Sequence, residues 1–371
     1  MEAGSKRVKL VISDFHLSRG KWLPDGRRNP LEDFHQDERF RELLEHYSMH
    51  AYQDFDVELI INGDFFDPLA VIADQSDYPR EVEEDAAVRQ FQVILDAHPV
   101  SVGALQVFLE RKKKIVMRWG NHDAAILWPK VQELIRRTLS PPSAELLEFQ
   151  QKPYIFDRIC IDHGHQFEVF NQFDENNIFV DRQTRDGVKR IQNLPFGSFF
   201  VLGFLNKLKL KHSYINQVYP FRMFLRVSMI TQPIFFILNG FKVMWFFIKM
   251  RLITHPMRFI RFRKTLLLLG EAFHRPSLEK VAEKILTADD STGLLYDTLI
   301  MGHNHQAAVR VFHNGKQYIN TGTWIPITSL DMSTLGHRVL RTYALIEYAN
   351  GKPRASLKIW NGQLHISDDF A

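Results

Sequence analysis

Carboxylate, amide and imidazole side chains recur in this sequence at the ends of short apolar runs. These residue types form strands poorly and are unfavourable to bury without partners. The five groups are Asp14-x-His16, Gly63-Asp64, Gly120-Asn121-His122-Asp123, His163-Gly164-His165 and Gly302-His303-x-His305. One such group could be a simple turn, but five groups in order along one chain indicate a shared site.

Together the five groups supply donor atoms for divalent metal ions. Carboxylate, amide carbonyl and imidazole donors without thiolates suit ions of intermediate hardness, such as Mn, Fe, Zn or Co. Glycines precede Asp64, Asn121 and His303, where they remove side chains at points at which the backbone must crowd a site. The single cysteine, Cys160, excludes an internal disulfide framework and is interpreted as a small buried residue.

The elements that would position these groups alternate along the chain. The apolar runs are typical of buried strands, and the segments between them have helical spacing. Two helical stripes are Phe40/Leu43/Leu44/Tyr47 and Leu278/Val281/Ala282/Ile285/Leu286. Alternation of this kind predicts an α/β fold, in which ligands collect where strands end. Residues 309–312, 317–320, 341–348 and 355–360 alternate like antiparallel strands, with turns at Asn314-Gly315 and Asn350-Gly351.

The order of the five groups resembles that of the calcineurin-like metallophosphoesterases. The resemblance implies a β-sandwich flanked by helices in an αββα arrangement. It also implies two metal sites that share one bridging carboxylate: Asp14, His16 and His305 at the first, Asn121, His163 and His303 at the second, and Asp64 between them.

The same resemblance implies roles for the remaining polar residues of the groups. His122 would lie beside the substrate phosphate, where it stabilises charge and protonates the leaving oxygen, and Asp123 would orient its ring. His165 is either an outer group of the site or an ordinary polar residue, and Asp67 is interpreted as a structural or outer carboxylate. Two ions about 3.5–4 Å apart lower the pKa of a shared water, so we expect hydrolysis without a covalent enzyme intermediate.

A basic, apolar segment separates the fourth group from the fifth. From Gly187 to Gly270 there are 14 Lys and Arg and no Asp or Glu, whereas the rest of the chain has 33 basic and 43 acidic residues. Residues 227–248 approach the length and apolarity of a membrane span, interrupted by a proline, an asparagine, a glycine and a lysine. Because His163 and His303 should bind one ion, the chain must return to the side it left, which favours an interfacial helical lid.

We therefore expect a catalytic domain over residues 1–186 and 271–371 and an insert over 187–270 that binds an anionic membrane surface or a lipid substrate. A helical cap that packs in a dimer interface or on the catalytic body is the alternative. A nucleic-acid partner is not expected, because such a surface does not need uninterrupted apolar runs. Four basic residues near the start of the insert could contact a diphosphate or simply be solvated: Arg182, Arg185, Lys189 and Arg190.

An acyl-chain-binding insert at this place is similar to that of the UDP-2,3-diacylglucosamine hydrolases, peripheral membrane enzymes of lipid A synthesis that release UMP and a lipid monophosphate. Those enzymes typically have Arg in place of His122 and a shorter insert. The leading expectation is a lipid-precursor pyrophosphatase. The alternatives are a phosphoesterase of a soluble nucleotide, nucleic acid or phosphoprotein, and a catalytically idle membrane adaptor.

The N-terminal sequence runs into an apolar strand without a secretory h-region or cleavage site. This pattern predicts a cytoplasmic protein that is peripherally associated with the inner face of the membrane. The oligomeric state is left open by the sequence.

Overall fold

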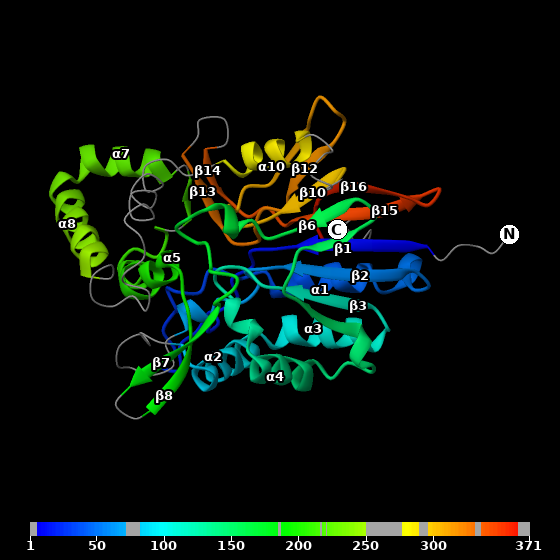
Figure 1. Ribbon diagram of the computed structural model, residues 1–371, viewed down its shortest axis with the longest axis horizontal. Helices are drawn as coiled ribbons and strands as arrows, with labels where there is room; N and C mark the ends of the chain where they lie inside the picture. Colours follow the sequence, from blue (N-terminus) through cyan, green and yellow to red (C-terminus); the bar gives the residue numbers. More distant parts are fainter. Residues whose placement is uncertain are drawn as a thin grey trace, which may run out of the picture.

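Two β-sheets lie at the centre of the molecule with helices on their outer faces (Figure 1). The computed structural model describes residues 6–71, 82–184, 187–215, 217–219, 221–249, 277–288, 296–330 and 335–362. The first sheet has the strand order β16-β15-β1-β2-β3-β4, and the second has the order β11-β12-β10-β6-β5.

The strands and helices of this sandwich follow the apolar runs and stripes of the sequence. The first sheet contains β1 (Arg7–Ile12), β2 (Asp56–Asn62), β3 (Lys114–Arg118), β4 (Leu147–Gln150), β15 (Thr342–Ala349) and β16 (Lys352–Ile359). The second contains β5 (Tyr154–Phe156), β6 (Ile159–Ile161), β10 (Thr298–Met301), β11 (Ala308–Val311) and β12 (Gln317–Asn320). The flanking helices are α1 (Asp37–His46), α2 (Glu84–Ala97), α3 (Pro99–Glu110), α4 (Pro129–Leu139) and α10 (Leu278–Thr287).

Three apolar clusters define the layers. Residues such as Val11 and Ile60 of the first sheet meet Ile161 and Ile300 of the second in the cluster between the sheets. The outer face of the first sheet packs against α1 to α4, and the outer face of the second packs against α10. The predicted αββα arrangement of sheets flanked by helices is therefore confirmed.

Local sequence signals account for the boundaries of several elements. The stripe Phe40, Leu43 and Leu44 is buried on α1, as its helical spacing predicts. The Asn350-Gly351 pair closes the antiparallel β15–β16 hairpin, and both residues have positive φ, at 51° and 74°. A two-residue turn of this type needs positive φ at both positions, which Asn and Gly adopt most readily.

Parallel pairing sets the edge at which the polar groups meet. β1, β2 and β3 pair in parallel in the first sheet, and β6 and β10 pair in parallel in the second. The polar groups follow the carboxyl ends of these five strands, so each sheet carries its groups along one edge.

The segment after the fourth polar group contains short elements and two longer helices. They are α5 (Phe196–Phe200), a π-helical turn (Val201–Leu205), α6 (Asn206–Lys209), β9 (Val218–Tyr219), α7 (Phe221–Thr231) and α8 (Pro233–Lys249). β7 (Phe179–Thr184) pairs with β8 (Gly187–Gln192), so the predicted boundary at residue 187 lies at the turn of a hairpin. Residues 250–276, which include the end of the expected insert, lie outside the described residues.

The base of the insert is built into the catalytic body. Lys209 forms an ion pair with Asp33 at 2.6 Å, and both side chains are buried. The amide of Asn206 donates to the carbonyl of Leu69, and β9 pairs in parallel with β13 (Ile327–Ser329), which also pairs with β14 (Gly336–Arg338). These contacts fix the start of the insert relative to the sheets.

Among the described residues, no single helix combines the length and apolarity of a membrane span. Helices α2 and α3 together have the length and composition of a membrane span, but they are bent by 90° relative to each other. Both helices bury apolar side chains, including Phe91 and Phe108, in the core.

A buried histidine joins the loop after β1 to α2 and α3. His98 lies between the carboxylates of Asp37, at 2.9 Å, and Glu32, at 3.2 Å. Glu32 in turn accepts hydrogen bonds from the backbone amides of Ser18, Gly20 and Phe34. Burial lowers the pKa of His98, but the two carboxylates outweigh this effect and raise the pKa to about 9. The protonated ring therefore stabilises the fold.

We expect the stability of the protein to fall between about pH 6 and about pH 9.5, by up to about 3 kcal/mol from His98. The pKa of His98 is higher in the fold than the unfolded value of 6.5, so its contribution is complete below that value and is lost as the pH rises through about 9. Urea unfolding at both pH values measures the loss, and His98→Gln should remove this part of the pH dependence. An identical pH dependence in wild type and variant would contradict the assignment.

Candidate metal centre

The structure brings the seven predicted metal-binding side chains to one edge of the sandwich. Each follows the carboxyl end of a parallel strand: Asp14 and His16 follow β1, Asp64 follows β2, Asn121 follows β3, His163 follows β6, and His303 and His305 follow β10. Hydrogen bonds between the backbones of these loops, from Asp14 to Gly63 and from His16 to Asp64, hold two of them side by side. Side chains far apart in the sequence thus share one site.

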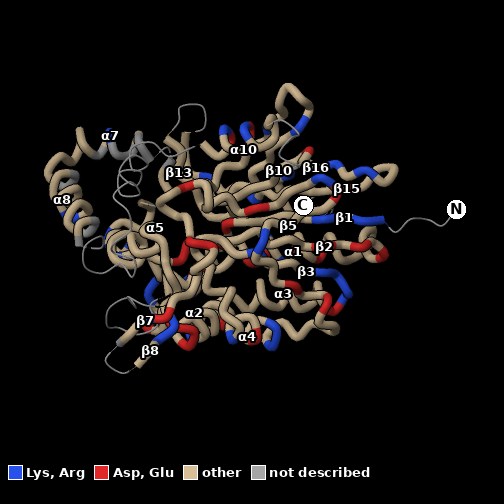
Figure 2. The backbone as a smooth tube through the Cα atoms, in the orientation of Figure 1, with Lys and Arg blue, Asp and Glu red and all other residues tan. Residues whose placement is uncertain are grey.

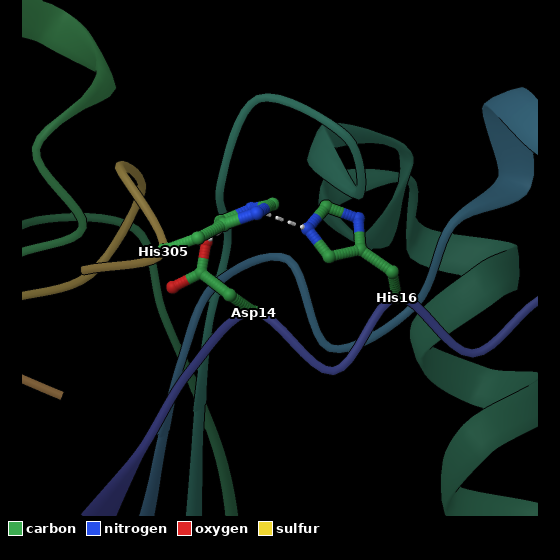
Figure 3. A group of neighbouring side chains, drawn as sticks. All are labelled: Asp14, His16 and His305. Atoms are coloured by element: carbon green, nitrogen blue, oxygen red, sulfur yellow. Dashed lines mark hydrogen bonds and ion pairs between the residues drawn. The ribbon is translucent and has the colours of Figure 1, made fainter. Parts of the chain in front are cut away.

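Asp14, His16 and His305 form one group that could hold a metal ion (Figure 3). The Nε2 atoms of His16 and His305 face each other at 3.0 Å, and His305 Nε2 is 3.5 Å from an Asp14 oxygen. Two imidazole nitrogens at this distance must share a proton or a cation. Burial and the nearby His16 hold the pKa of His305 well below its ordinary value, and the neutral ring is the form that binds a metal.

Asp64, His163 and His303 form a second group, and the loop that carries Asn121 adjoins it, since the backbone amide of His122 donates to Asp64. His163 Nε2 is 3.2 Å from Asp64. The side-chain oxygen of Asn121 and Nδ1 of His303 are buried without a hydrogen-bond partner among the described residues, and buried Nε2 of His163 has no partner there besides Asp64. These are one donor atom from each side chain assigned to the second metal site. Because a buried polar atom without a partner is unfavourable, this donor set fits a divalent cation.

Asp64 lies between the two groups. Its carboxylate is 3.2 Å from His163 and 4.0 Å from His16, and its other oxygen accepts the backbone amide of His122 at 2.8 Å. Burial raises the pKa of Asp64, but the imidazoles of His163 and His122 outweigh burial, and the pKa lies well below its ordinary value. A carboxylate in this position is ionised and available to ions on both sides.

The backbone around the groups is crowded and partly left-handed. Asp14, His16, Asp64, His303 and His305 all have positive φ, between 51° and 70°. Such conformations are uncommon outside glycine and cluster at functional sites, where the surrounding structure must hold them.

The three glycines before the predicted ligands, at positions 63, 120 and 302, permit the close approach that the sequence predicts. A Cβ at Gly120 would lie 2.8 Å from His163 Nε2, and one at Gly63 would lie 2.6 Å from His163 Nδ1. A Cβ at Gly302 would overlap Ser13 and Asp14. A side chain at any of these positions would push the donor groups apart.

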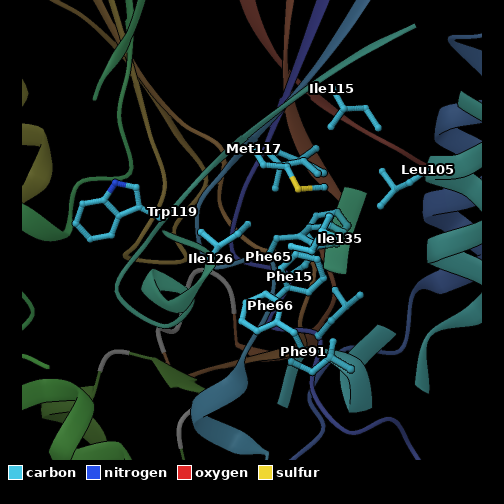
Figure 4. Packing of buried hydrophobic residues seen from close by; sticks show 14 of the residues in the cluster. Phe15, Phe65, Phe66, Phe91, Leu105, Ile115, Met117, Trp119, Ile126 and Ile135 are labelled. Carbon is cyan, nitrogen blue, oxygen red and sulfur yellow. The ribbon is translucent and has the colours of Figure 1, made fainter. Parts of the chain in front are cut away.

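Aromatic side chains of the core anchor the loops that carry the predicted ligands. Phe15, between Asp14 and His16, is fully buried and packs against Trp324 and Phe65 with ring centroids 4.7 Å and 5.2 Å apart. Figure 4 shows Phe15, Phe65 and Phe66 in the cluster that continues to Phe91. Apolar residues that alternate with donors therefore anchor the site to the core.

Asp67, and not Asp123, contacts the His122 ring. Nδ1 of His122 lies 3.0 Å from Asp67. Both oxygens of Asp123 instead accept backbone amides, from Gly120 at 2.6 Å and from Phe65 at 3.0 Å. The prediction that Asp123 orients His122 is therefore wrong, because the amides of its own loop and of the loop after β2 occupy its carboxylate.

Asp67 also faces His16, at 3.7 Å, and a third group that could hold a metal ion consists of His16, Asp67 and His122. Burial disfavours the protonated form of His122, but Asp67 and Asp64 outweigh burial and raise its pKa to about 9. Asp67 and Asp64 thus favour the protonated form of the His122 ring, which lies next to both groups that could hold a metal ion.

The remaining predicted residues lie around this centre or on the β7–β8 hairpin. His165 is buried against Trp119, with ring centroids 4.6 Å apart, and its ring centroid is 5.5 Å from that of His163. Lys189 forms an ion pair with Glu83, the residue before α2, at 2.8 Å. Arg182 is opposite Lys189 and Arg190 is opposite Asp181 in the hairpin, and Arg185 lies outside the described residues. A phosphate-binding role for these basic residues stays a prediction.

Two partners of the predicted metal-binding histidines have no signal in the sequence. The backbone carbonyl of Asn62 accepts from His163 Nδ1 at 2.8 Å, and Glu168 lies 3.1 Å from His303 Nε2. Neither partner belongs to one of the five groups, and only the packing of the loops brings them to the rings.

We expect Asp64→Asn to weaken Mn²⁺ binding by more than the roughly 10–100-fold that loss of an outer partner causes, because both groups lose their shared charge. Asn has nearly the same size and tolerates positive φ, so the fold should persist. Titration calorimetry with chelator-treated protein measures the affinity. Asp25→Asn, at an exposed ion pair with Arg27, is the control. Equal affinity in wild type and Asp64→Asn would exclude Asp64 as a ligand.

The comparisons with known proteins agree with this geometry. A family model described as calcineurin-like phosphoesterase matches residues 9–307. No curated protein matches the chain. Among solved structures, the calcineurin-like phosphoesterase YfkN from Bacillus subtilis is 12% identical to this chain with a TM-score of 0.35. The matched region covers 97% of this chain and 93% of the YfkN chain.

Two further structures are similarly distant. A dimetal phosphatase from Danio rerio is 10% identical with a TM-score of 0.33, covering 94% of this chain and 98% of its own. A Vps29 double mutant from Entamoeba histolytica is 13% identical with a TM-score of 0.18, covering 69% and 89%. These likenesses are weak, so the family assignment depends on the family model, which spans most of the chain and all five polar groups. The chain belongs to the calcineurin-like phosphoesterase family.

Proposed function

We propose that this protein is a di-metal phosphohydrolase that cleaves a phosphoester or diphosphate bond of an amphiphilic substrate at an anionic membrane surface. Membership in the calcineurin-like family supports a metal-dependent phosphoester hydrolase. The number of ions, the choice of Mn²⁺ as the first candidate, the lipid substrate and the membrane surface are our proposals.

The described side chains at the centre would have two roles, metal binding and hydrogen bonding to the substrate. Asp14, His16 and His305 would hold one ion, Asn121, His163 and His303 the other, and Asp64 both. When bound, such ions supply positive charge at the phosphate and lower the pKa of a water molecule. His122, whose ring is fixed by Asp67, is placed to donate a hydrogen bond to a phosphate or leaving-group oxygen.

The observation that carries the membrane proposal is an apolar stripe that faces away from the protein. On α8, Ile234, Ile237, Leu238, Phe241, Trp245 and Ile248 follow helical spacing and are all exposed, with Ile234 74% and Trp245 65% exposed. On α7, Ile230 is 76% exposed. Figure 1 shows both helices at the edge of the molecule, away from the two sheets. In water such a surface would be unfavourable and prone to aggregation unless something covers it.

The positive charge of the insert favours an anionic lipid surface as the partner that covers the apolar stripe. The helices carry exposed Arg226 and Lys242, α6 adds exposed Lys207, and the turn that follows α6 adds exposed Lys211. Residues 187 to 270 contain no Asp or Glu, and the coloured parts of α7 and α8 in Figure 2 accordingly carry no acidic residue. Apolar side chains would enter the acyl boundary, and each nearby cation adds about 1 kcal/mol of attraction to anionic head groups.

The base of the insert connects this surface to the metal centre. The hydroxyl of Ser198, on α5, lies 3.4 Å from the backbone carbonyl of Asn121. The backbone amide of Gly197 donates to Phe170 at 2.7 Å, which ties α5 to the loop after His163. A substrate with acyl chains along the insert could therefore present its phosphate to the centre, as a UDP-diacylglucosamine-type diphosphate would when it is cleaved to UMP and a lipid monophosphate.

We expect the protein to co-sediment with vesicles that contain phosphatidylglycerol, and the triple variant Ile230→Glu/Ile234→Glu/Trp245→Glu to bind them at least about tenfold more weakly. Each side chain loses its apolar contribution of about 1.5–3 kcal/mol and gains a charge that anionic lipids repel. Sedimentation at several lipid concentrations measures the affinity.

The matched control is Val309→Glu/Val311→Glu, two exposed apolar positions on β11 outside the insert. This variant should bind vesicles like the wild type. If the wild type stays in the supernatant and forms a dimer that the triple variant disrupts, the insert is an interface between two copies and the membrane proposal is wrong.

We expect Mn²⁺-loaded protein to release UMP from UDP-diacylglucosamine in mixed micelles much faster than from the deacylated analogue. The apolar insert should hold the acyl chains, and the triple variant should lose this preference while it keeps its rate on a soluble phosphodiester. Chromatography of the nucleotide product measures both rates. Turnover of soluble esters without UMP release would contradict the lipid substrate but not the hydrolase, and no turnover of any ester would favour an idle adaptor.

A further inference from the structure

Glu168 contacts a metal-binding histidine from outside the five polar groups. One of its carboxylate oxygens, Oε2, lies 3.1 Å from Nε2 of His303, and both side chains are almost fully buried. The other ring nitrogen of His303, Nδ1, is buried without a hydrogen-bond partner among the described residues. The two nitrogens of one ring therefore have different environments.

We propose that Glu168 is a positioning residue of the metal centre, which accepts a hydrogen bond from Nε2–H of His303 and so keeps the Nδ1 lone pair directed toward the second metal-binding group. This inference rests on the proposed metal-dependent function, since it assigns His303 as a ligand. A neutral imidazole carries one proton, and an acceptor at one nitrogen fixes that proton there and leaves the other nitrogen free for a cation.

The neighbouring predicted ligand His163 also has an acceptor at one ring nitrogen and the metal-binding group at the other, but its Nδ1 and Nε2 have the opposite roles. Its Nδ1 lies 2.8 Å from the backbone carbonyl of Asn62, and its buried Nε2 faces Asp64 at 3.2 Å and has no other partner among the described residues. The two rings thus present opposite nitrogens to one site, and each has an acceptor on its far side. Only the acceptor of His303 is a side chain, so only that acceptor can be changed by substitution.

The local fold holds Glu168 in place. It directly follows the 3-10 turn His165–Phe167, and its backbone amide donates to the carbonyl of His165 at 3.2 Å. The side chain of Asn171 donates to the same Oε2 atom at 2.8 Å. The carbonyl of Phe170 accepts the amide of Gly197 at the start of the insert. Glu168 therefore also joins the ligand His303 to the loop that supports the insert.

The test compares Glu168→Leu, which removes the acceptor at similar volume, with Glu168→Gln, which keeps a side-chain oxygen. Loss of an outer partner of a metal ligand weakens metal affinity roughly 10–100-fold. We expect Glu168→Leu to show this loss for one of the Mn²⁺ ions in titration calorimetry, and Glu168→Gln to recover most of the affinity. Glu58→Leu and Glu58→Gln, at a buried carboxylate on β2 that contacts Tyr154, are the matched controls and should leave Mn²⁺ affinity unchanged.

A second measurement separates positioning from folding. In metal-free protein at alkaline pH, ring ¹⁵N shifts should show His303 protonated at Nε2 in the wild type and in Glu168→Gln, and a mixture of both tautomers in Glu168→Leu. The His303→Gln spectrum identifies the signals. Unchanged tautomer and unchanged Mn²⁺ affinity in Glu168→Leu would overturn the role of Glu168 alone, whereas a wild type that binds no Mn²⁺ would overturn the metal-dependent function itself.

Discussion

The structure depends on one electrostatic constraint, the close packing of carboxylates and imidazoles around Asp64. A buried carboxylate next to His16 and His163, with donor atoms of Asn121 and His303 that have no hydrogen-bond partner in the described part of the chain, is unfavourable in a protein interior. Divalent cations would relieve this crowding, since they would bind the unpaired donors and balance the negative charge. The rest of the domain stabilises an arrangement that the donor groups alone would not adopt.

The sandwich supplies that stabilisation from three directions. Parallel strands of two different sheets end at the site, so predicted ligands that follow β1, β2 and β3 meet those that follow β6 and β10 across the cluster between the sheets. Phe15 and Phe65 fasten the loops to the aromatic core, and glycines at 63, 120 and 302 allow the loops to approach. The left-handed backbone at several ligands is tolerable because these contacts over-determine it.

The insert relates to the centre through its base and not through its long helices. Lys209, Asn206 and Ser198 tie the base to the loops after β1, β2 and β3, and α7 and α8 extend outward with their apolar stripe exposed. A base that contacts the loops of the predicted metal ligands and an apolar outer surface suit an enzyme whose substrate has one charged and one apolar end. This arrangement is the physical basis of the membrane proposal.

The sequence by itself determined the reaction class, the αββα layers and the residues that gather at the centre. These features depend on local patterns: donors at the ends of apolar runs, helical stripes, and Asn-Gly at a hairpin turn. The tertiary structure alone decided which carboxylate faces which ring. Asp123 follows His122 directly, yet backbone amides occupy it, and Asp67 and Glu168 reach the histidines from other loops.

The direction of the apolar stripe on α8 was likewise undecided by sequence, because helical periodicity is the same for a stripe that faces a core and one that faces outward. Side-chain partners across loops and the outward face of a helix depend on how distant segments pack, and that information is not contained in the spacing of neighbouring residues.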